Sequence, residues 1–238
     1  MANFINKYLD QSAYDADSTK QFPNTSLVGT DVVFKMSDEP EPVAFGGLTV
    51  KYNISDPTQE VTLFSGGGAS SSTSSSESES GGGGAMPSKM YVDGNEETPI
   101  NTWRFETAGE HIVQYEFADN VVPGGFLSNN PIYTEVIVGD DITEIGQTTF
   151  YNAHNEGILT SATIGTGIES IGEQAFSGNI NMTSLTINTT TPPTLFGANS
   201  FANTNDCPIY VPAESVNTYR TTSVIGWDSY TERIQAIQ

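Results

Sequence analysis

Two segments near the carboxyl end decide the fold: residues 141–150 read DITEIGQTTF, and residues 167–176 read GIESIGEQAF. Aligned on their Ile-Gly pairs, the two segments agree at four positions, each separated by 26 residues. A looser third copy ends at Phe201, 25 residues after Phe176, and Pro192-Pro193 disturbs its middle. Single Ile-Gly pairs are common, but a register kept at four positions predicts an internal repeat. The pairs are Ile142 and Ile168, Ile145 and Ile171, Gly146 and Gly172, and Phe150 and Phe176.

The length of this repeat predicts a short solenoid. A period of 26 lies inside the range of roughly 20 to 29 residues in which each coil lays one strand beside the last and buries its Ile, Leu and Phe against its neighbours. Gly146 and Gly172 follow the core isoleucines, where we expect a tight turn or a positive φ. About three coils are present, so a cap on the open end is expected to be essential for folding.

The residues of the repeat resemble a known family. The pattern I-x-x-I-G-x-x-A/T-F resembles the BspA-like leucine-rich repeats, and IYVPAESVNTY at 209–219, with Gly226-Trp227 behind it, is similar to the cap that closes such arrays. The resemblance covers residues 132–238. It implies a leucine-rich-repeat domain in which a helical stretch follows Pro212 and Trp227 covers the open end.

Residues 37–131 carry a different β pattern. Short apolar runs of about five residues recur at intervals of about ten, parted by Gly, Pro, Asn and Asp, which predicts a small β-sandwich. Residues 65–87, rich in Gly and Ser, are expected to form a flexible loop between strands. In HIVQYEF (111–117), alternation places His111, Val113, Tyr115 and Phe117 on the core face. The runs lie at 43–54, 61–64, 89–92, 102–105 and 111–117.

A second resemblance refines this prediction. TAGEHIVQY (107–115) is similar to a late strand of immunoglobulin-like modules such as PKD-type and bacterial Ig-like domains. It implies an Ig-like β-sandwich over residues 37–131. The expected fold class is therefore mainly β: an extended N-terminal arm, an Ig-like β-sandwich, and a short leucine-rich-repeat solenoid of about three coils with a C-terminal cap.

The leading residues, 1–36, have too few periodic apolar positions for a core of their own. The stretch AYDADS…P…SLV…DVVF resembles N-terminal segments of structural proteins of crAss-like and other Bacteroides phages. That resemblance implies a docking arm that tethers an appendage to capsid or other virion proteins; the alternative is an edge strand on the sandwich. The candidate capsid-docking residues are Tyr8, Tyr14, Asp15, Asp17, Phe22 and Phe34.

Composition narrows the partners. The 238 residues include 29 acidic and 8 basic side chains, for a net charge of −21. Between Phe105 and Tyr219 there are 13 acidic residues and no Lys or Arg. Nucleic-acid binders neutralise phosphates with clustered cations, so no nucleic-acid partner is expected. The same charge disfavours an anionic membrane surface.

Compartment and assembly follow from simple features. The lone Cys207 cannot form an internal disulfide, and the first residues lack the apolar region of a signal peptide. No stretch approaches the roughly 20 apolar residues of a membrane span, so no membrane insertion is expected. We expect assembly in a host cytoplasm into a virion. A small solenoid without disulfides gains stability from association, and a homotrimer is predicted.

The sequence offers little catalytic chemistry. His111 and His154 have no neighbours at metal-ligand spacing, and no G-x-S-x-G elbow is present. Asp140 and Asp141 offer oxygen ligands of the kind Ca²⁺ takes, but no D-x-D-x-D-G loop accompanies them. No enzyme activity, cofactor or metal site is predicted. Sugar rings stack on exposed aromatics, so the glycan-contact candidates are Trp103, Tyr151, His154 and Trp227; for both tryptophans, burial is the alternative.

Three functions remain in view. The favoured one is a structural protein of a bacteriophage virion, a head fibre or capsid-decorating appendage, tethered by its arm and displaying the repeat tip to host surface polysaccharide. The second is a bacterial cell-surface BspA-like adhesin. The third is a polysaccharide hydrolase, which needs two carboxylates facing each other in a groove.

Overall fold

The structure is a computed structural model that describes residues 45–65, 86–130, 132–153 and 158–238. The chain divides into two units, Met1–Pro42 and Val43–Gln238, and the described residues all lie in the second. The predicted arm with its six docking residues lies outside the described residues. So do His154 and most of the predicted loop 65–87.

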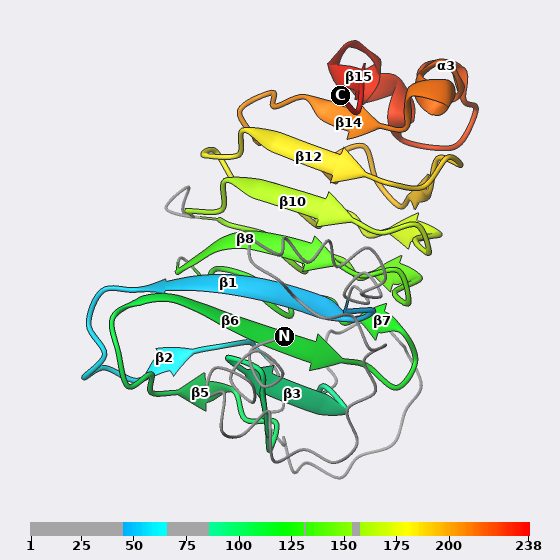
Figure 1. Cartoon of the computed structure of the whole chain (residues 1–238). Coiled ribbons are helices and arrows are strands. Elements are labelled where there is room, and N and C mark those ends of the chain that lie inside the picture. The colour runs from blue at the N-terminus through cyan, green and yellow to red at the C-terminus, as the bar shows by residue number, and fades with distance from the viewer. Residues whose placement is uncertain (1–44, 66–85, 131, 154–157) are drawn as a thin grey trace, which may run out of the picture. The chain divides into compact units, whose positions relative to one another are not determined.

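The second unit is built on a mixed sheet of nine strands in the order β15-β14-β12-β10-β8-β1-β6-β3-β4. Figure 1 shows these strands stacked from the cap, near the C-terminus, down to β3. The mainly β class predicted from the sequence is confirmed. The strands are β15 Ile234–Ala236, β14 Ile209–Val211, β12 Ser184–Ile187, β10 Ser161–Ile164, β8 Tyr133–Val138, β1 Leu48–Ile54, β6 Gly109–Glu116, β3 Lys89–Val92 and β4 Asn95–Glu97.

Equivalent strands of the repeat stack in parallel and in register. Glu135 on β8 pairs with Ser161 on β10, 26 residues on, and Ser161 pairs with Ser184 on β12. A second parallel sheet, in the order β13-β11-β9-β7, follows the same coils. Each coil thus contributes one strand to either sheet and buries the residues between them. The strands of the second sheet are β7 Val121–Val122, β9 Glu144–Ile145, β11 Ser170–Ile171 and β13 Thr194–Leu195.

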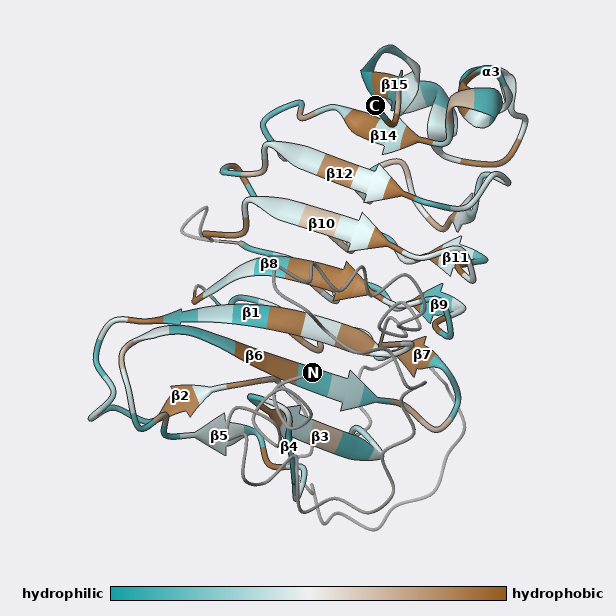
Figure 2. Cartoon of the chain, in the orientation of Figure 1, coloured by the Kyte–Doolittle hydropathy of each residue, from teal (hydrophilic) through white to brown (hydrophobic). Residues whose placement is uncertain are grey.

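Aromatic rings form a column through the coils. Phe150, Phe176 and Phe201 are fully buried, with ring centroids 4.8 Å apart for the first pair and 5.8 Å for the second. Figure 2 shows why the coils close: apolar and polar residues alternate along β10 and β12, so that one face of each strand lines this core. Because each ring contacts the next coil, no coil completes its core alone.

The carboxyl end closes the stack as predicted. After Pro212 come a 3-10 turn, η1 (Ala213–Ser215), and a short helix, α3 (Val216–Thr221); a second 3-10 segment, η2 (Trp227–Arg233), leads into β15. The Trp227 ring lies 6.0 Å from that of Phe201, and its indole Nε1 donates to the Pro193 carbonyl at 2.7 Å. The indole therefore covers the last ring of the column with its own donor satisfied.

The leading strands do not form the self-contained sandwich expected from their pattern. β1 pairs antiparallel with β6 on one edge and with β8 on the other, so the leading strands and the coils share one sheet. Opposite this part of the sheet, the other layer is a pair of two-residue strands, β2 (Val61–Thr62) and β5 (Thr102–Trp103). The alternating pattern fixed which face is buried but carried no information about which edge pairs with which.

The repeat glycines also act differently from the expectation. Gly146 and Gly172 do not have positive φ; they permit close approach, since a Cβ on Gly172 would lie 2.4 Å from the Gln147 nitrogen. Positive φ falls instead two residues later, at Thr148 (55°) and Gln174 (56°). The missing side chain lets successive coils stack backbone against backbone at this corner.

One coil escaped the sequence comparison. Val122 on β7 pairs with Ile145, and the Leu127 amide donates to the Thr149 carbonyl, as the Phe150 amide does to Ala175 in the next coil. This first coil is offset by 23 residues rather than 26, and it carries Leu127 where the later coils carry phenylalanine. The shorter spacing and the absent Ile-Gly pair hid it.

Candidate functional site

The structure scatters the predicted glycan-contact aromatics. Trp103 lies on β5 beside the leading strands, half-buried against the core, and Tyr151 lies half-buried at a corner of the coils. Trp227 is 0 % exposed within the cap, so it cannot stack on a sugar, and this candidate is withdrawn. Its burial follows from its place as the ring that ends the aromatic column. The three side chains come from separate parts of the fold and form no joint surface.

Trp103 does line a pocket of about 340 Å³ at the end of the leading strands. Apolar and charged groups alternate around it. Phe105 stacks on the ring of His111, with centroids 4.3 Å apart, and forms its floor. The remaining polar lining includes Asp93, Asn95, Glu97, Arg104, Glu106 and Thr107.

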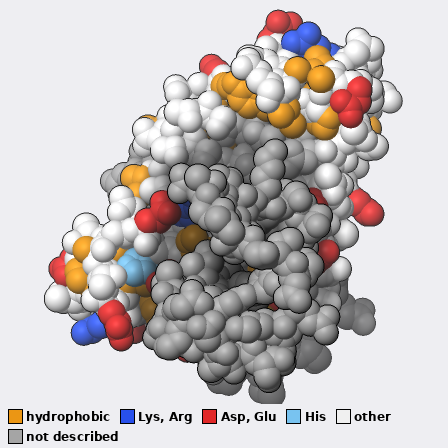
Figure 3. Space-filling model, viewed as in Figure 1, with side chains coloured by type: hydrophobic (Ala, Val, Ile, Leu, Met, Phe, Trp, Pro, Cys, Tyr) orange, Lys and Arg blue, Asp and Glu red, His pale blue; other side chains and the backbone are white. Residues whose placement is uncertain are grey.

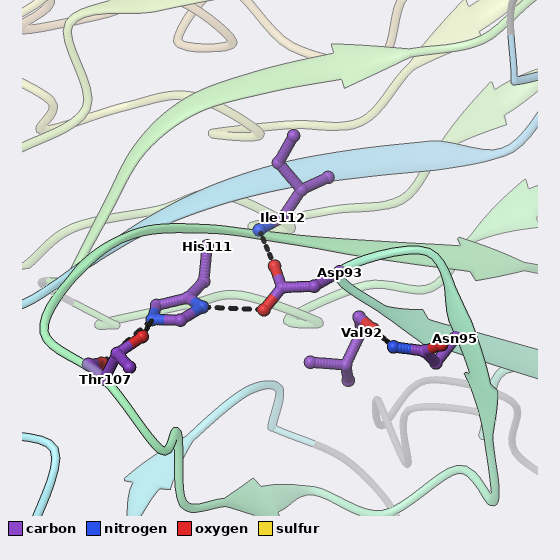
Figure 4. A network of polar contacts seen from close by, with 6 residues as sticks. All are labelled: Val92, Asp93, Asn95, Thr107, His111 and Ile112. Carbon is purple, nitrogen blue, oxygen red and sulfur yellow. Dashed lines mark hydrogen bonds and ion pairs between the residues drawn. The ribbon is translucent and has the colours of Figure 1, made fainter. Parts of the chain in front are cut away.

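His111 is held at both ring nitrogens (Figure 4). Nδ1 lies 2.7 Å from Asp93 Oδ2, and Nε2 lies 2.9 Å from the Thr107 carbonyl oxygen. The other oxygen of Asp93 accepts the backbone N–H of Ile112 at 2.9 Å. The alternation of β6 turns His111 toward the core, as predicted, and the imidazole there ties three segments together.

Asp93 owes its position to a two-residue turn. Asp93 and Gly94 connect β3 to β4, with φ of 50° and 82°. Positive φ at both central residues is the geometry that Asp-Gly favours in hairpins. The Asp-Gly pair at 93–94 was therefore a usable hairpin signal, but nothing in the sequence linked it to His111, which is 18 residues away.

The two acceptors decide the charge state of the imidazole. Burial by itself lowers the pKa of His111, but the hydrogen bonds to Asp93 and to the Thr107 carbonyl, together with the negative charge of Asp93, outweigh burial. The pKa of His111 is therefore raised above its ordinary 6.5. A ring that donates from both nitrogens has no free nitrogen to abstract a proton. His111 acts here as a structural strut.

The acidic residues weighed as Ca²⁺ ligands are occupied locally. Asp140 Oδ1 accepts the backbone amide and the hydroxyl of Thr166, at 2.6 and 2.9 Å. Asp119 Oδ1 accepts the Val121 amide at 3.2 Å. Within the described ranges, no three His, Cys, Asp or Glu side chains gather as metal ligands do. Nor does that part of the chain contain a helix with the length and apolarity to cross a membrane.

Comparison with known proteins agrees with the coils. Residues 125–224 match a family described as BspA type leucine rich repeat region (6 copies). The chain thus carries a BspA-type leucine-rich-repeat domain, whose match begins within the coil that the sequence comparison missed. No curated protein matches the chain.

Proposed function

We propose that this chain is a non-catalytic adhesion protein: the repeat domain recognises a glycan on a bacterial surface, and residues 1–36 attach the protein to its carrier. The observation that supports this most is the stack of BspA-type coils over residues 125–224. Their interior is filled by the aromatic column and closed by the cap, which leaves recognition to the outside of the coils.

Two carriers fit this proposal. The resemblance of the leading residues to phage structural proteins favours a virion, on which the chain is a head fibre or capsid-decorating protein, as a homotrimer. The BspA-type repeat favours the alternative, a bacterial cell surface. Antibody labelling of purified particles and of intact cells separates the two, and deletion of residues 1–36 is expected to abolish incorporation while the repeat domain stays folded.

The adhesion itself is tested on intact Bacteroides cells with the fluorescently labelled full chain. Periodate cleaves the vicinal diols of sugars, whereas protease removes surface proteins. Binding that is lost after periodate and retained after protease is expected, with a labelled protein of similar negative charge as the control for nonspecific attachment. Binding that resists periodate and disappears with protease would contradict a glycan receptor.

A further inference from the structure

The outward face of the nine-stranded sheet carries two straight rows of side chains. The register aligns the first row across five strands and the second across four, and each residue alternates with buried neighbours. Strands about 4.8 Å apart make the first row about 19 Å long. The outer row is Thr49, Ile137, Thr163, Thr186 and Tyr210; the second row is Lys51, Glu135, Ser161 and Ser184.

The hydroxyls of these rows are unused within the described part of the chain. Thr163, Thr186, Ser161 and Ser184 form no side-chain hydrogen bond there, nor does the phenol of Tyr210. Threonines just before the same strands behave differently: the hydroxyls of Thr160 and Thr183 each donate to a carbonyl of the preceding coil at 3.0 Å. The rows therefore present a flat array of free donors and acceptors.

The two rows are also electrically neutral, although the chain has a net charge of −21. Glu135 is the one carboxylate among their nine residues, and Lys51 Nζ lies 2.8 Å from its Oε2. Both side chains remain more than a quarter exposed, and the hydrogen bond to Glu135 raises the pKa of Lys51. Figure 3, which views this side of the molecule, shows carboxylates and cations scattered singly rather than in clusters.

These properties exclude most classes of partner. The negative charge of the whole chain repels anionic polymers, and the rows offer no unpaired carboxylate to a cationic one. An apolar partner would leave the serine and threonine hydroxyls desolvated without hydrogen bonds. An uncharged polymer rich in hydroxyls meets none of these penalties, and each of its hydroxyls both donates and accepts.

The half-buried ring of Tyr210, at one end of the outer row, adds a stacking surface for a sugar. The spacing between strands is similar to the advance of one unit along an extended pyranose chain. We propose that this face, from β1 to β14, binds an extended neutral polysaccharide lying across the strands. The inference rests on the adhesion function proposed above and assigns it a surface and a ligand class.

The test is affinity electrophoresis of the full chain in native gels that contain dextran, yeast mannan, galactomannan or xyloglucan, with polygalacturonate as the anionic comparison. At least one neutral polymer is expected to retard the protein, and polygalacturonate is not. The double variant Thr163→Val/Thr186→Val keeps the shape of the outer row but removes two hydroxyls. Its affinity is expected to fall about 25-fold, about fivefold for each hydrogen bond.

A matched control is available on the other sheet. Thr194 on β13 is equally half-buried and points outward, so Thr194→Val is expected to leave retardation unchanged. Tyr210→Ser should weaken retardation as the valine pair does. Unaltered far-UV circular dichroism and thermal midpoints establish that each variant is folded.

Three results would overturn the proposal. The first is no retardation of the wild-type chain by any of the neutral polymers. The second is retardation that survives the row variants but disappears in Trp103→Ala, which leaves the adhesion function standing and moves its site to the pocket. The third is dissociation of an oligomer by Tyr210→Ser in sedimentation, which would show that a second copy covers this face. Adhesion fails separately if the periodate experiment on cells is negative.

Discussion

Replacing Phe176 by alanine tests the idea that neighbouring coils share one core. The ring is 0 % exposed, and its centroid lies 4.8 Å from that of Phe150 and 5.8 Å from that of Phe201. Truncating a buried phenylalanine costs about 3 to 5 kcal/mol, from lost burial and from the cavity left behind. Since a natural domain has a total stability of about 5 to 15 kcal/mol, this one side chain carries a large share of it.

Urea unfolding followed by far-UV circular dichroism measures the loss. With an m-value of about 2 kcal/mol/M, a loss of about 4 kcal/mol lowers the midpoint by about 2 M. Phe196→Ala is the matched control, because that ring is 63 % exposed; its change is expected to stay within about 0.5 kcal/mol. A loss below about 1 kcal/mol for Phe176→Ala, or one equal to the control, would refute the shared core.

Two further substitutions test local features. Gly172→Ala places a Cβ 2.4 Å from the Gln147 nitrogen, in backbone that cannot step aside, so unfolding free energy is expected to fall by about 1 to 3 kcal/mol; an unchanged urea midpoint would show that the coils have slack at this corner. For His111, the raised pKa means that the charged ring contributes stability below pH 6.5 and loses it as pH rises through the folded-state pKa. The stability difference between wild type and His111→Asn should therefore be larger near about pH 6 than near about pH 9, and a difference that grows with pH would contradict the strut.

The sequence predicted the coils well because their physics is local and repeated. A core residue such as Ile145 or Ile171 recurs at a constant offset, since each coil must match its neighbour along the stack. The cap was predictable for a related reason: the last ring of the column needs a cover, and Trp227 supplies it. The first coil was missed because its offset of 23 residues and its Leu127 break the pattern.

Features that depend on distant pairing were not predictable. Alternation in residues 48–54 and 111–117 showed which side chains face the core, but the pairing of β1 with β8 depends on backbone edges that carry no sequence signal. The same holds for the contact of His111 with Asp93. The outer row could have been found once the coils were aligned, since Thr163 and Thr186 occupy equivalent positions, but its neutrality depends on Lys51 from the leading strands.

The central claim is that one sheet unites the leading strands with the coils, and the two tryptophans test it directly. Trp103 lies beside the leading strands and Trp227 lies in the cap, so single-tryptophan variants Trp227→Phe and Trp103→Phe report on opposite ends of the sheet. In urea, the fluorescence transition of each variant is expected to coincide with its own far-UV circular dichroism transition, as a single cooperative unit requires. A circular dichroism curve with two steps, one tracked by Trp103 and the other by Trp227, would show two independent domains and contradict the account.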